Sequence, residues 1–281
     1  MKMNRSMSRP LVGSHKSAHM LIPEIYRQHW QQRWRFRVRQ AALDGLYLKA
    51  RLSGQLARTL TTPRVQFLYT HAIPDQYIDN VAKLLKQLAR DHVFVDYGTA
   101  AAQVADATIQ QPTLCFSLDD GLIVSERVLS LFDQSGIRAC FFVVGGWVGV
   151  RDGVFDWAAL ERLRTGGHTI GAHSMTHPDM PKISLAQAQD EIGTCRDLLI
   201  RQFGVCDHFA WPYGHTTPEL TALATQIGFR SIATGARGHY TARDSTVHSA
   251  YNPLDYLYNL HRDAWFVEEP TRNIFTLMAA H

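Results

Sequence analysis

The sequence predicts an α/β fold built on a parallel sheet, either open or closed into a barrel. Two observations carry this prediction. From residue 64 onward, short apolar runs of strand length alternate with amphipathic segments of helical period. The strand-length runs are almost continuously apolar, as is typical of parallel strands that are covered on both faces. In such folds the chemistry gathers at the carboxyl ends of the strands.

The predicted elements follow one another in regular order. Apolar runs predict strands at 65–70, 92–95, 113–118, 138–144, 168–172, 208–211 and 230–233. Apolar residues three and four positions apart predict helices at 76–90, 127–134, 158–164, 185–203 and 218–227. Because helices separate most of the successive strands, we expect the strands to run parallel.

Length and composition limit the class of protein. The chain of 281 residues is long enough for one domain of barrel size with an appendage. A content of 46% hydrophobic and 19% charged residues excludes a wholly disordered or fibrous chain. The four cysteines form no Cys-x-x-Cys pair, so we expect reduced, partly buried thiols.

The N-terminal fifth differs in charge from the rest of the chain. Residues 1–60 carry 12 Lys and Arg against two acidic residues, a net charge of +10, whereas the remaining 221 residues carry −6. We therefore divide the chain into a basic tail with an amphipathic helix at 1–62 and a β/α domain at 63–281. Attraction to an anionic partner is expected from the first of these parts.

The helix predicted in the basic part has more than one interpretation. Tyr26, Trp30, Trp34 and Val38 recur every four residues, with arginines between them. The aromatic stripe could pack on the core, or the helix could lie on an anionic bilayer, where Trp and Arg suit the headgroup region. We expect no nucleic acid partner, because no binding motif accompanies the charge.

The sequence also gives an expectation about location. The N-terminus lacks an apolar run of signal-peptide length, and no stretch of about 18 apolar residues occurs. A cytoplasmic location is therefore expected, and the basic segment raises the hypothesis of peripheral association with the inner membrane face.

Three polar clusters directly follow predicted strands. They read Ser-Leu-Asp-Asp-Gly at 117–121, His-Ser-Met-Thr-His at 173–177 and Trp-Pro-Tyr-Gly at 211–214. Adjacent carboxylates at a strand end point apart, so one can bind a cation while the other faces elsewhere. Two histidines four residues apart can converge on a metal ion. Each cluster alone also has a bland interpretation, since Asp-Asp-Gly is common in turns and the chain has 14 histidines.

In this order, the clusters resemble the motifs of the polysaccharide deacetylases, also called carbohydrate esterase family 4 or the NodB-homology domain. The family's Thr-Phe-Asp-Asp-Gly reads Ser-Leu-Asp-Asp-Gly here, and its His-Ser/Thr-x-x-His is matched completely. The resemblance covers about residues 65–265. It implies a distorted (β/α)7 barrel that removes N-acetyl groups from amino sugars with one divalent metal ion, most often Zn²⁺.

The resemblance also implies roles for individual residues. Asp120, His173 and His177 would be the metal ligands, which agrees with the three protein ligands and open position of catalytic zinc sites. Asp119 would be the general base toward the attacking water. The backbone N–H of Tyr213, held in a rigid Pro-Tyr-Gly turn, would bind the oxyanion.

Two positions depart from the family pattern or leave a role open. Ala210 stands where the family commonly has an arginine that pairs with the base. Either Arg237 or Arg262 could replace it from another strand end, or this branch of the family manages without one. The family's Leu-x-His motif would make His261 the general acid that protonates the departing amine. His71, after the first strand, and Trp147, in a loop, are further candidates for lining the site, or they are ordinary structural residues.

The sequence therefore predicts a metal-dependent hydrolase acting on an N-acylated carbohydrate, either a polysaccharide or a lipid-linked glycan. Two alternatives stay open. A small-molecule amidohydrolase or deformylase would need the same metal site with a closed pocket. A non-catalytic glycan-binding module would explain the absence of the motif arginine.

Overall fold

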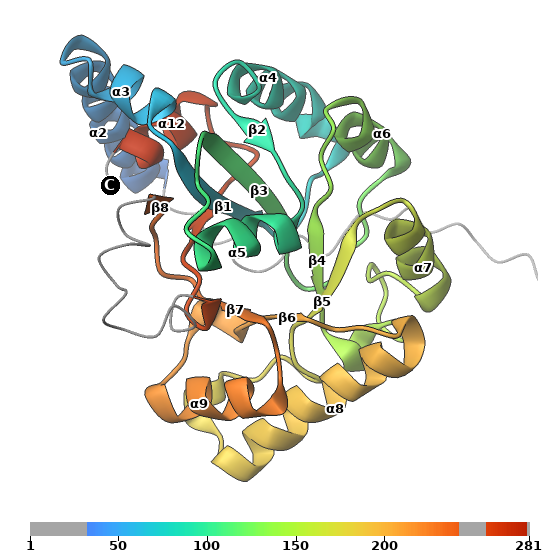
Figure 1. Cartoon of the computed structure of the whole chain (residues 1–281). Coiled ribbons are helices and arrows are strands. Elements are labelled where there is room, and N and C mark those ends of the chain that lie inside the picture. The colour runs from blue at the N-terminus through green and yellow to red at the C-terminus, as the bar shows by residue number, and fades with distance from the viewer. Residues whose placement is uncertain (1–32, 242–256, 280–281) are drawn as a thin grey trace, which may run out of the picture.

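The computed structural model describes residues 33–241 and 257–279. Its centre is a curled sheet in which neighbouring strands run parallel in the order β7-β6-β5-β4-β3-β1 (Figure 1). These strands are β1 (Arg64–Thr70), β3 (Pro112–Leu118), β4 (Cys140–Val143), β5 (Thr169–Ala172), β6 (His208–Ala210) and β7 (Ser231–Ala233). Each lies within two residues of a strand predicted from the sequence.

A short C-terminal segment connects the two edges of this sheet. β9 (Arg262–Ala264) pairs in parallel with β1, with Arg262 opposite Phe67. Just before it, Leu260 forms a parallel bridge with Ala233 of β7. The predicted distorted (β/α)7 barrel is thus confirmed, and β9 supplies a strand that the sequence did not show. Two further short strands extend the sheet. β2 (Val93–Phe94) pairs in parallel with β3, and β8 (Tyr240–Thr241) pairs antiparallel with β1.

The helices between the strands begin and end at residues suited to helix termini. They are α4 (Ile78–Leu88), α6 (Glu126–Gln134), α7 (Trp157–Thr165), α8 (Leu185–Phe203) and α9 (Pro218–Ile227). At α6, α7, α8 and α9 a Ser, Asp or Thr side chain accepts a hydrogen bond from a backbone N–H of the first turn. α8 also has a complete capping box between Ser184 and Gln187, so its start is fixed by sequence alone.

Alternating side chains of the strands form two separate apolar clusters. Leu114 and Phe116 of β3 belong to the outer cluster, beneath the helices, whereas Cys115 between them belongs to the inner one. The inner cluster also contains one face of α5 (Tyr97–Ala105), which fills the barrel interior from one side. The sequence analysis missed this helix, because alanines dominate it and give little apolar periodicity. All four cysteines are buried and free, as expected.

The basic segment continues into two helices that pack on the C-terminal helix. These are α2 (Arg33–Leu52), α3 (Gln55–Thr61) and α12 (Arg272–Ala279), which lie together at one corner of the molecule (Figure 1). The single predicted helix is interrupted at Gly54, whose φ of 70° is left-handed and breaks the helical hydrogen bonding. Tyr26 and Trp30 of the predicted aromatic stripe lie outside the described residues. Val38 is 64% exposed, so this member of the stripe does not pack on the core.

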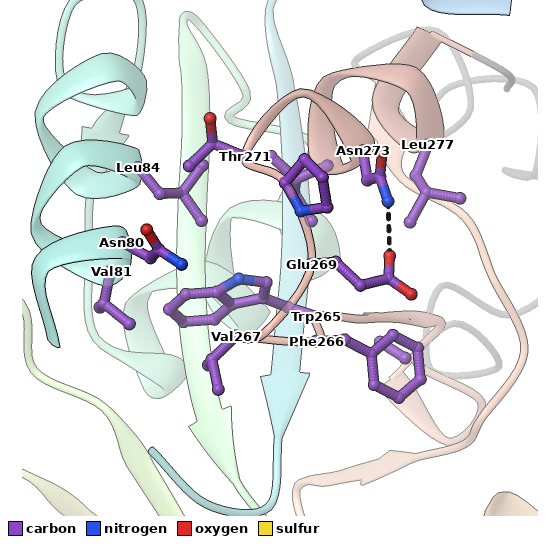
Figure 2. Close-up of a pocket in the computed structure, with 13 residues that line it drawn as sticks. Asn80, Val81, Leu84, Trp265, Phe266, Val267, Glu269, Thr271, Asn273 and Leu277 are labelled. Atoms are coloured by element: carbon purple, nitrogen blue, oxygen red, sulfur yellow. Dashed lines mark hydrogen bonds between the residues drawn. The ribbon is translucent and has the colours of Figure 1, made fainter. Parts of the chain in front are cut away.

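Polar contacts attach α2 to the C-terminal segment. Arg39 pairs with Glu269, and the Arg272 guanidinium donates two hydrogen bonds to the Asp44 carboxylate. Figure 2 shows the neighbouring hydrogen bond from Asn273 to Glu269, 2.7 Å long, beside the ring of Trp265. The extension is therefore joined to the last helix of the chain. Within the described ranges, no helix is both long and apolar enough to cross a bilayer.

Candidate metal centre and catalytic site

Three of the predicted residues form one compact cluster. Oδ1 of Asp120 lies 3.4 Å from Nε2 of His173 and 3.3 Å from Nε2 of His177. Asp120 follows β3 and the two histidines follow β5. Both strands run parallel to β4, which lies between them, so their carboxyl ends bring the three side chains to the same end of the barrel. One carboxylate and two imidazole atoms within 4.8 Å of one another form a possible divalent metal site.

The backbone around this cluster adopts an uncommon conformation. Asp120, Ser174, His177 and Tyr213 all have φ between 58° and 71°, the left-handed region that non-glycine residues rarely occupy. Each such residue costs roughly 1 kcal/mol or more and persists only where its surroundings hold it. Four of them at one place indicate that the fold maintains this geometry at the expense of local stability.

The hydrogen bonds of His173 test whether the cluster suits a cation. Its Nδ1 lies 2.7 Å from the backbone carbonyl oxygen of Ala210, so Nδ1 carries the proton and donates it there. Nε2 then presents a lone pair to the Asp120 carboxylate, which also carries lone pairs and no proton. Within the described ranges, Oδ1 of Asp120 is buried without a hydrogen-bond partner. Two acceptors facing each other are stabilised by a cation between them, so these residues fit a divalent metal ion.

The second carboxylate of the Asp-Asp pair points into the barrel. Asp119 is 3% exposed, and Arg262 donates to both of its oxygens, at 2.7 Å and 2.8 Å. Burial works to raise the pKa of Asp119, but the Arg262 guanidinium outweighs it and holds that pKa below its usual value. Asp119 is thus ionised at neutral pH and fixed in orientation.

Arg262 resolves the question raised by Ala210. It begins β9, is 1% exposed, and also donates to the hydroxyl of Ser117 at 3.2 Å. Its guanidinium lies 4.5 Å from the ring centre of Tyr69. Arg237, the other candidate, is exposed. The arginine that pairs with Asp119 therefore comes from the strand that joins the sheet edges, 143 residues away in sequence.

His261 and His71 occupy different surroundings. Neighbouring residues of an extended segment point to opposite sides. Since Arg262 points to Asp119, the His261 side chain turns the other way, where it lies against Gly238 and Tyr240. His71 follows β1, and its charge contributes to lowering the pKa of both Asp119 and Asp120. The structure thus brings His71, which the sequence left open, to the carboxylates.

Two aromatic side chains border the cluster. The Tyr213 ring centre lies 4.7 Å from that of His177, and Tyr213 is 58% exposed. Trp147 lies on another side of His177, at 5.5 Å. Gly146 next to it approaches the loop so closely that a Cβ there would lie 2.6 Å from the carbonyl oxygen of Met175. The sequence left the place of Trp147 open, and the structure brings its ring next to His177.

A carboxylate outside the motifs holds the histidine loop. Glu191 on α8 accepts hydrogen bonds from the backbone N–H groups of Met175 and Thr176 at 3.0 Å and 2.8 Å. It also accepts one from the Thr176 hydroxyl at 2.6 Å. Ser174 adds a further contact, since its hydroxyl oxygen accepts from the N–H of His177. Sequence reasoning missed Glu191, because a single acid on an amphipathic helix gives no local signal.

Fold and site together define a β/α-barrel protein with an Asp-His-His cluster and a separate Asp-Arg pair at the carboxyl ends of its strands. Residues 106–232 match the sequence model described as polysaccharide deacetylase. This match agrees with the resemblance to the family that the ordered motifs indicate. The matched stretch contains the metal cluster, Asp119 and Tyr213, and ends before Arg262.

Curated relatives are similar to part of the chain. The chain is 28% identical over 126 residues to a chitooligosaccharide deacetylase of Bradyrhizobium, covering 41% of this chain and 52% of that protein. It is 25% identical over 122 residues to a peptidoglycan-N-acetylglucosamine deacetylase of Bacillus cereus, covering 42% of each. The chain thus spans about half the length of these relatives.

Two solved structures share the fold over most of the chain. The Streptococcus pyogenes deacetylase PplD superposes with a TM-score of 0.66 at 15% identity, covering 77% of this chain and 99% of that one. IcaB from Ammonifex degensii gives a TM-score of 0.62 at 17% identity, with 77% and 97% covered. The barrel architecture is therefore shared at low sequence identity.

Proposed function

We propose that this protein is a metal-dependent deacetylase that removes N-acetyl groups from an amino sugar of a polysaccharide or lipid-linked glycan. The observation that carries the proposal is the arginine-paired Asp119 beside the Asp120-His173-His177 cluster. The acetylated amino-sugar substrates named for the Bradyrhizobium and Bacillus cereus relatives support the substrate class. The proposed ion is Zn²⁺, for which two imidazoles and one carboxylate are common ligands.

Asp120, His173 and His177 would hold the ion. When bound, a divalent ion supplies Lewis-acid chemistry, because it polarises the amide carbonyl and makes water a better nucleophile. Asp119 then accepts the proton of the attacking water. Its pairing with Arg262 keeps it charged and oriented before the reaction, so no energy is spent on reorganisation at that step.

Two further groups complete the proposed chemistry. The N–H of Tyr213, held at a positive φ between Pro212 and Gly214, donates to the oxyanion that forms from the carbonyl. The departing amine takes a proton from a histidine. His261 was predicted for this step, but its ring lies against Gly238 and Tyr240, so we propose His71, which shares the electrostatic environment of both carboxylates.

The alternatives differ in how well they fit. The binding-module alternative was motivated by a missing arginine, and Arg262 now supplies that partner for Asp119. The small-molecule alternative needs a closed pocket, whereas Tyr213 at the border of the cluster is 58% exposed. Both observations favour turnover of a substrate larger than a single small amide.

The test measures acetate release from N-acetylglucosamine oligomers and the metal content of the same samples. Wild type is expected to hold about one ion per chain and to release acetate, and Asp119→Asn to keep the ion but lose about 10²–10⁴-fold in rate, as for a general base. His173→Ala is expected to lose both, whereas His215→Ala, an exposed histidine outside the cluster, should lose neither. Oligomer binding without acetate release by metal-loaded wild type would overturn the proposal. Faster release from formamides or single sugars would favour the small-molecule alternative.

We also propose that the extension contacts an anionic membrane surface, at the inner membrane face. Along α2 the side chains of Val38, Leu48 and Leu52 are more than half exposed, next to exposed Arg37 and Lys49. Replacing Leu48 and Leu52 by Ser should reduce cosedimentation with phosphatidylglycerol vesicles. Val150→Ser removes an exposed apolar side chain from a loop outside α2 and should leave cosedimentation unchanged. Equal sedimentation of all three proteins would contradict this placement.

A further inference from the structure

A polar cavity lies at the end of β1 opposite to the catalytic site. Its volume is about 250 Å³, and it is lined by Gln55, Arg58, Thr59, Thr62, Arg64 and His239. Arg64 begins β1, whereas His71 follows its last residue. With a rise of about 3.3 Å per residue, the two ends of this strand are roughly 20 Å apart. The cavity is therefore distinct from the Asp120-His173-His177 cluster. Most of its lining residues belong to α3 and to the start of β1, and Figure 1 shows α3 leading into β1.

Arg64 is a buried cation whose hydrogen-bonding capacity is only partly used. It is 1% exposed, and its Nη2 contacts Nε2 of His92 at 3.0 Å. Nε and Nη1 have no hydrogen-bond partner among the residues that the structure describes. No carboxylate of that part of the chain lies within ion-pair distance of this guanidinium. A guanidinium that stays charged is costly to bury in this state.

His92 satisfies one donor of Arg64 but contributes no negative charge. Its Nδ1 lies 3.2 Å from the carbonyl oxygen of Leu88 and donates to it, which leaves Nε2 as the acceptor for Arg64. Burial, together with the charge of Arg64, lowers the pKa of His92 to about 4. His92 is therefore neutral at physiological pH, and Asp263 raises the pKa of Arg64 only from a longer distance.

Among the described residues that line the cavity, those other than Arg64 add a second cation and no acid. Arg58 is exposed on α3, and its side chain is 3.4 Å from the carbonyl oxygen of Ser53. No Asp or Glu is among the described residues that line the cavity. Two guanidinium groups with hydroxyl and amide neighbours match the recognition of a tetrahedral oxyanion, since guanidinium binds phosphate with paired hydrogen bonds.

The hollow beside Trp265 (Figure 2) makes a useful contrast. Its volume is about 10 Å³, and Glu269 is among its lining residues. That is room for about one water molecule. It is a gap in the packing, whereas the cavity at Arg64 is large enough for a phosphate group with part of the molecule that carries it.

We propose that the cavity formed by Arg58, Arg64 and the polar residues of α3 binds a phosphate group. Two sources share this chemistry, namely a free phosphate or phosphate ester and the phosphodiester headgroup of an anionic lipid. Both are compatible with the net charge of +10 carried by residues 1–60. The proposal is independent of the deacetylase activity.

The experiment titrates the full chain with inorganic phosphate at constant ionic strength, followed by calorimetry. Arg58→Gln tests the exposed cation without disturbing the core, and Arg201→Gln removes an exposed arginine of α8 as the matched control. Losing one charge-assisted pair should weaken binding about tenfold or more. Arg64→Met should abolish binding, and circular dichroism establishes that this variant is folded.

The outcomes separate the proposal from its rivals. Binding that is weakened by Arg58→Gln and kept by Arg201→Gln supports the site. Phosphate bound at the metal cluster would survive Arg58→Gln, and such a result overturns the proposal, as does the absence of binding to both phosphate and vesicles. A lipid headgroup is identified as the source if the protein cosediments with phosphatidylglycerol but not with phosphatidylcholine vesicles. This cosedimentation should depend on Arg58, and free phosphate added at the same ionic strength should not reduce it.

Discussion

The two ends of the barrel each bury an arginine to the same degree, and the two arginines have opposite electrostatic surroundings. Arg262 and Arg64 are both 1% exposed. Arg262 donates to both oxygens of Asp119, and this partner raises its pKa despite burial, whereas burial lowers the pKa of Arg64 to about 10. The difference shows that burial alone does not determine the role of a charged residue. Whether an oppositely charged partner lies within hydrogen-bond distance matters more. At one end the charge orients the carboxylate that we propose as the base, and at the other end it lies at the proposed phosphate site.

The largest effect expected from this comparison is on stability. Arg262→Met leaves the Asp119 carboxylate buried without its cation, and such losses cost about 3–5 kcal/mol. Arg64→Met orphans no carboxylate and removes an incompletely partnered charge, so it should leave stability unchanged or raise it in phosphate-free buffer. Urea unfolding of the two variants measures the difference.

A double variant controls for simple loss of packing at Arg262. Asp119→Leu combined with Arg262→Met removes both charges and should recover most of the lost stability, though not the activity. Equal destabilisation by Arg262→Met and Arg64→Met would remove the distinction between the two ends of the barrel.

A smaller effect is expected on the pH dependence of stability. Burial lowers the pKa of both His92 and His208 to about 4, from an ordinary value near 6.5. Between these values the unfolded chain binds more protons than the folded one, so stability should fall as the pH falls from about 6.5 to 4. The loss should be on the order of 3 kcal/mol for each histidine at the lower limit.

His92→Gln isolates the part of this pH dependence that comes from the end of the barrel at Arg64. Glutamine can still accept the hydrogen bond from Nη2 of Arg64, but it does not titrate. We expect the slope of unfolding free energy against pH to become smaller in this window, while the shares of His208 and of His168, whose pKa burial also lowers, are retained. An unchanged slope would show that His92 is already protonated beside Arg64, contrary to the tautomer inferred from its contact with Leu88.

How far the site could be predicted depends on whether its parts are local in sequence. Asp120, His173 and His177 lie in short motifs directly after strands, and the structure brings together the ligand set that the motifs imply. The partner of Asp119 was left between Arg237 and Arg262, because a side chain 143 residues away is positioned by strand pairing rather than by spacing.

Short elements account for the rest of what the sequence did not reveal. β9 has three residues and no apolar pattern of its own, yet its register decides which of two adjacent side chains faces the interior. The side chain of Arg262 faces the interior, and that of His261 therefore points the other way. α5 was missed for the related reason that alanine gives little periodicity, although its Tyr97 is fully buried. The barrel itself was predictable because its strands and caps are encoded locally.

The smallest effect concerns how the catalytic end is held together. Glu191 fixes the backbone of the histidine loop through Met175 and Thr176, and removing contacts of this kind around metal ligands typically costs about 10–100-fold in metal affinity or activity. Glu191→Ala should therefore weaken metal binding about tenfold. Glu191→Gln should have an intermediate effect, because its single amide oxygen can accept only some of the three hydrogen bonds that Glu191 accepts. Asp190→Ala, an exposed acid one residue away, should leave metal affinity unchanged. Metal titration with a chelating competitor measures the affinities. If Glu191→Ala binds metal as tightly as wild type, Glu191 is not needed to hold the left-handed backbone at Ser174 and His177. The close packing of Gly146 against Met175 and the barrel itself would then be sufficient.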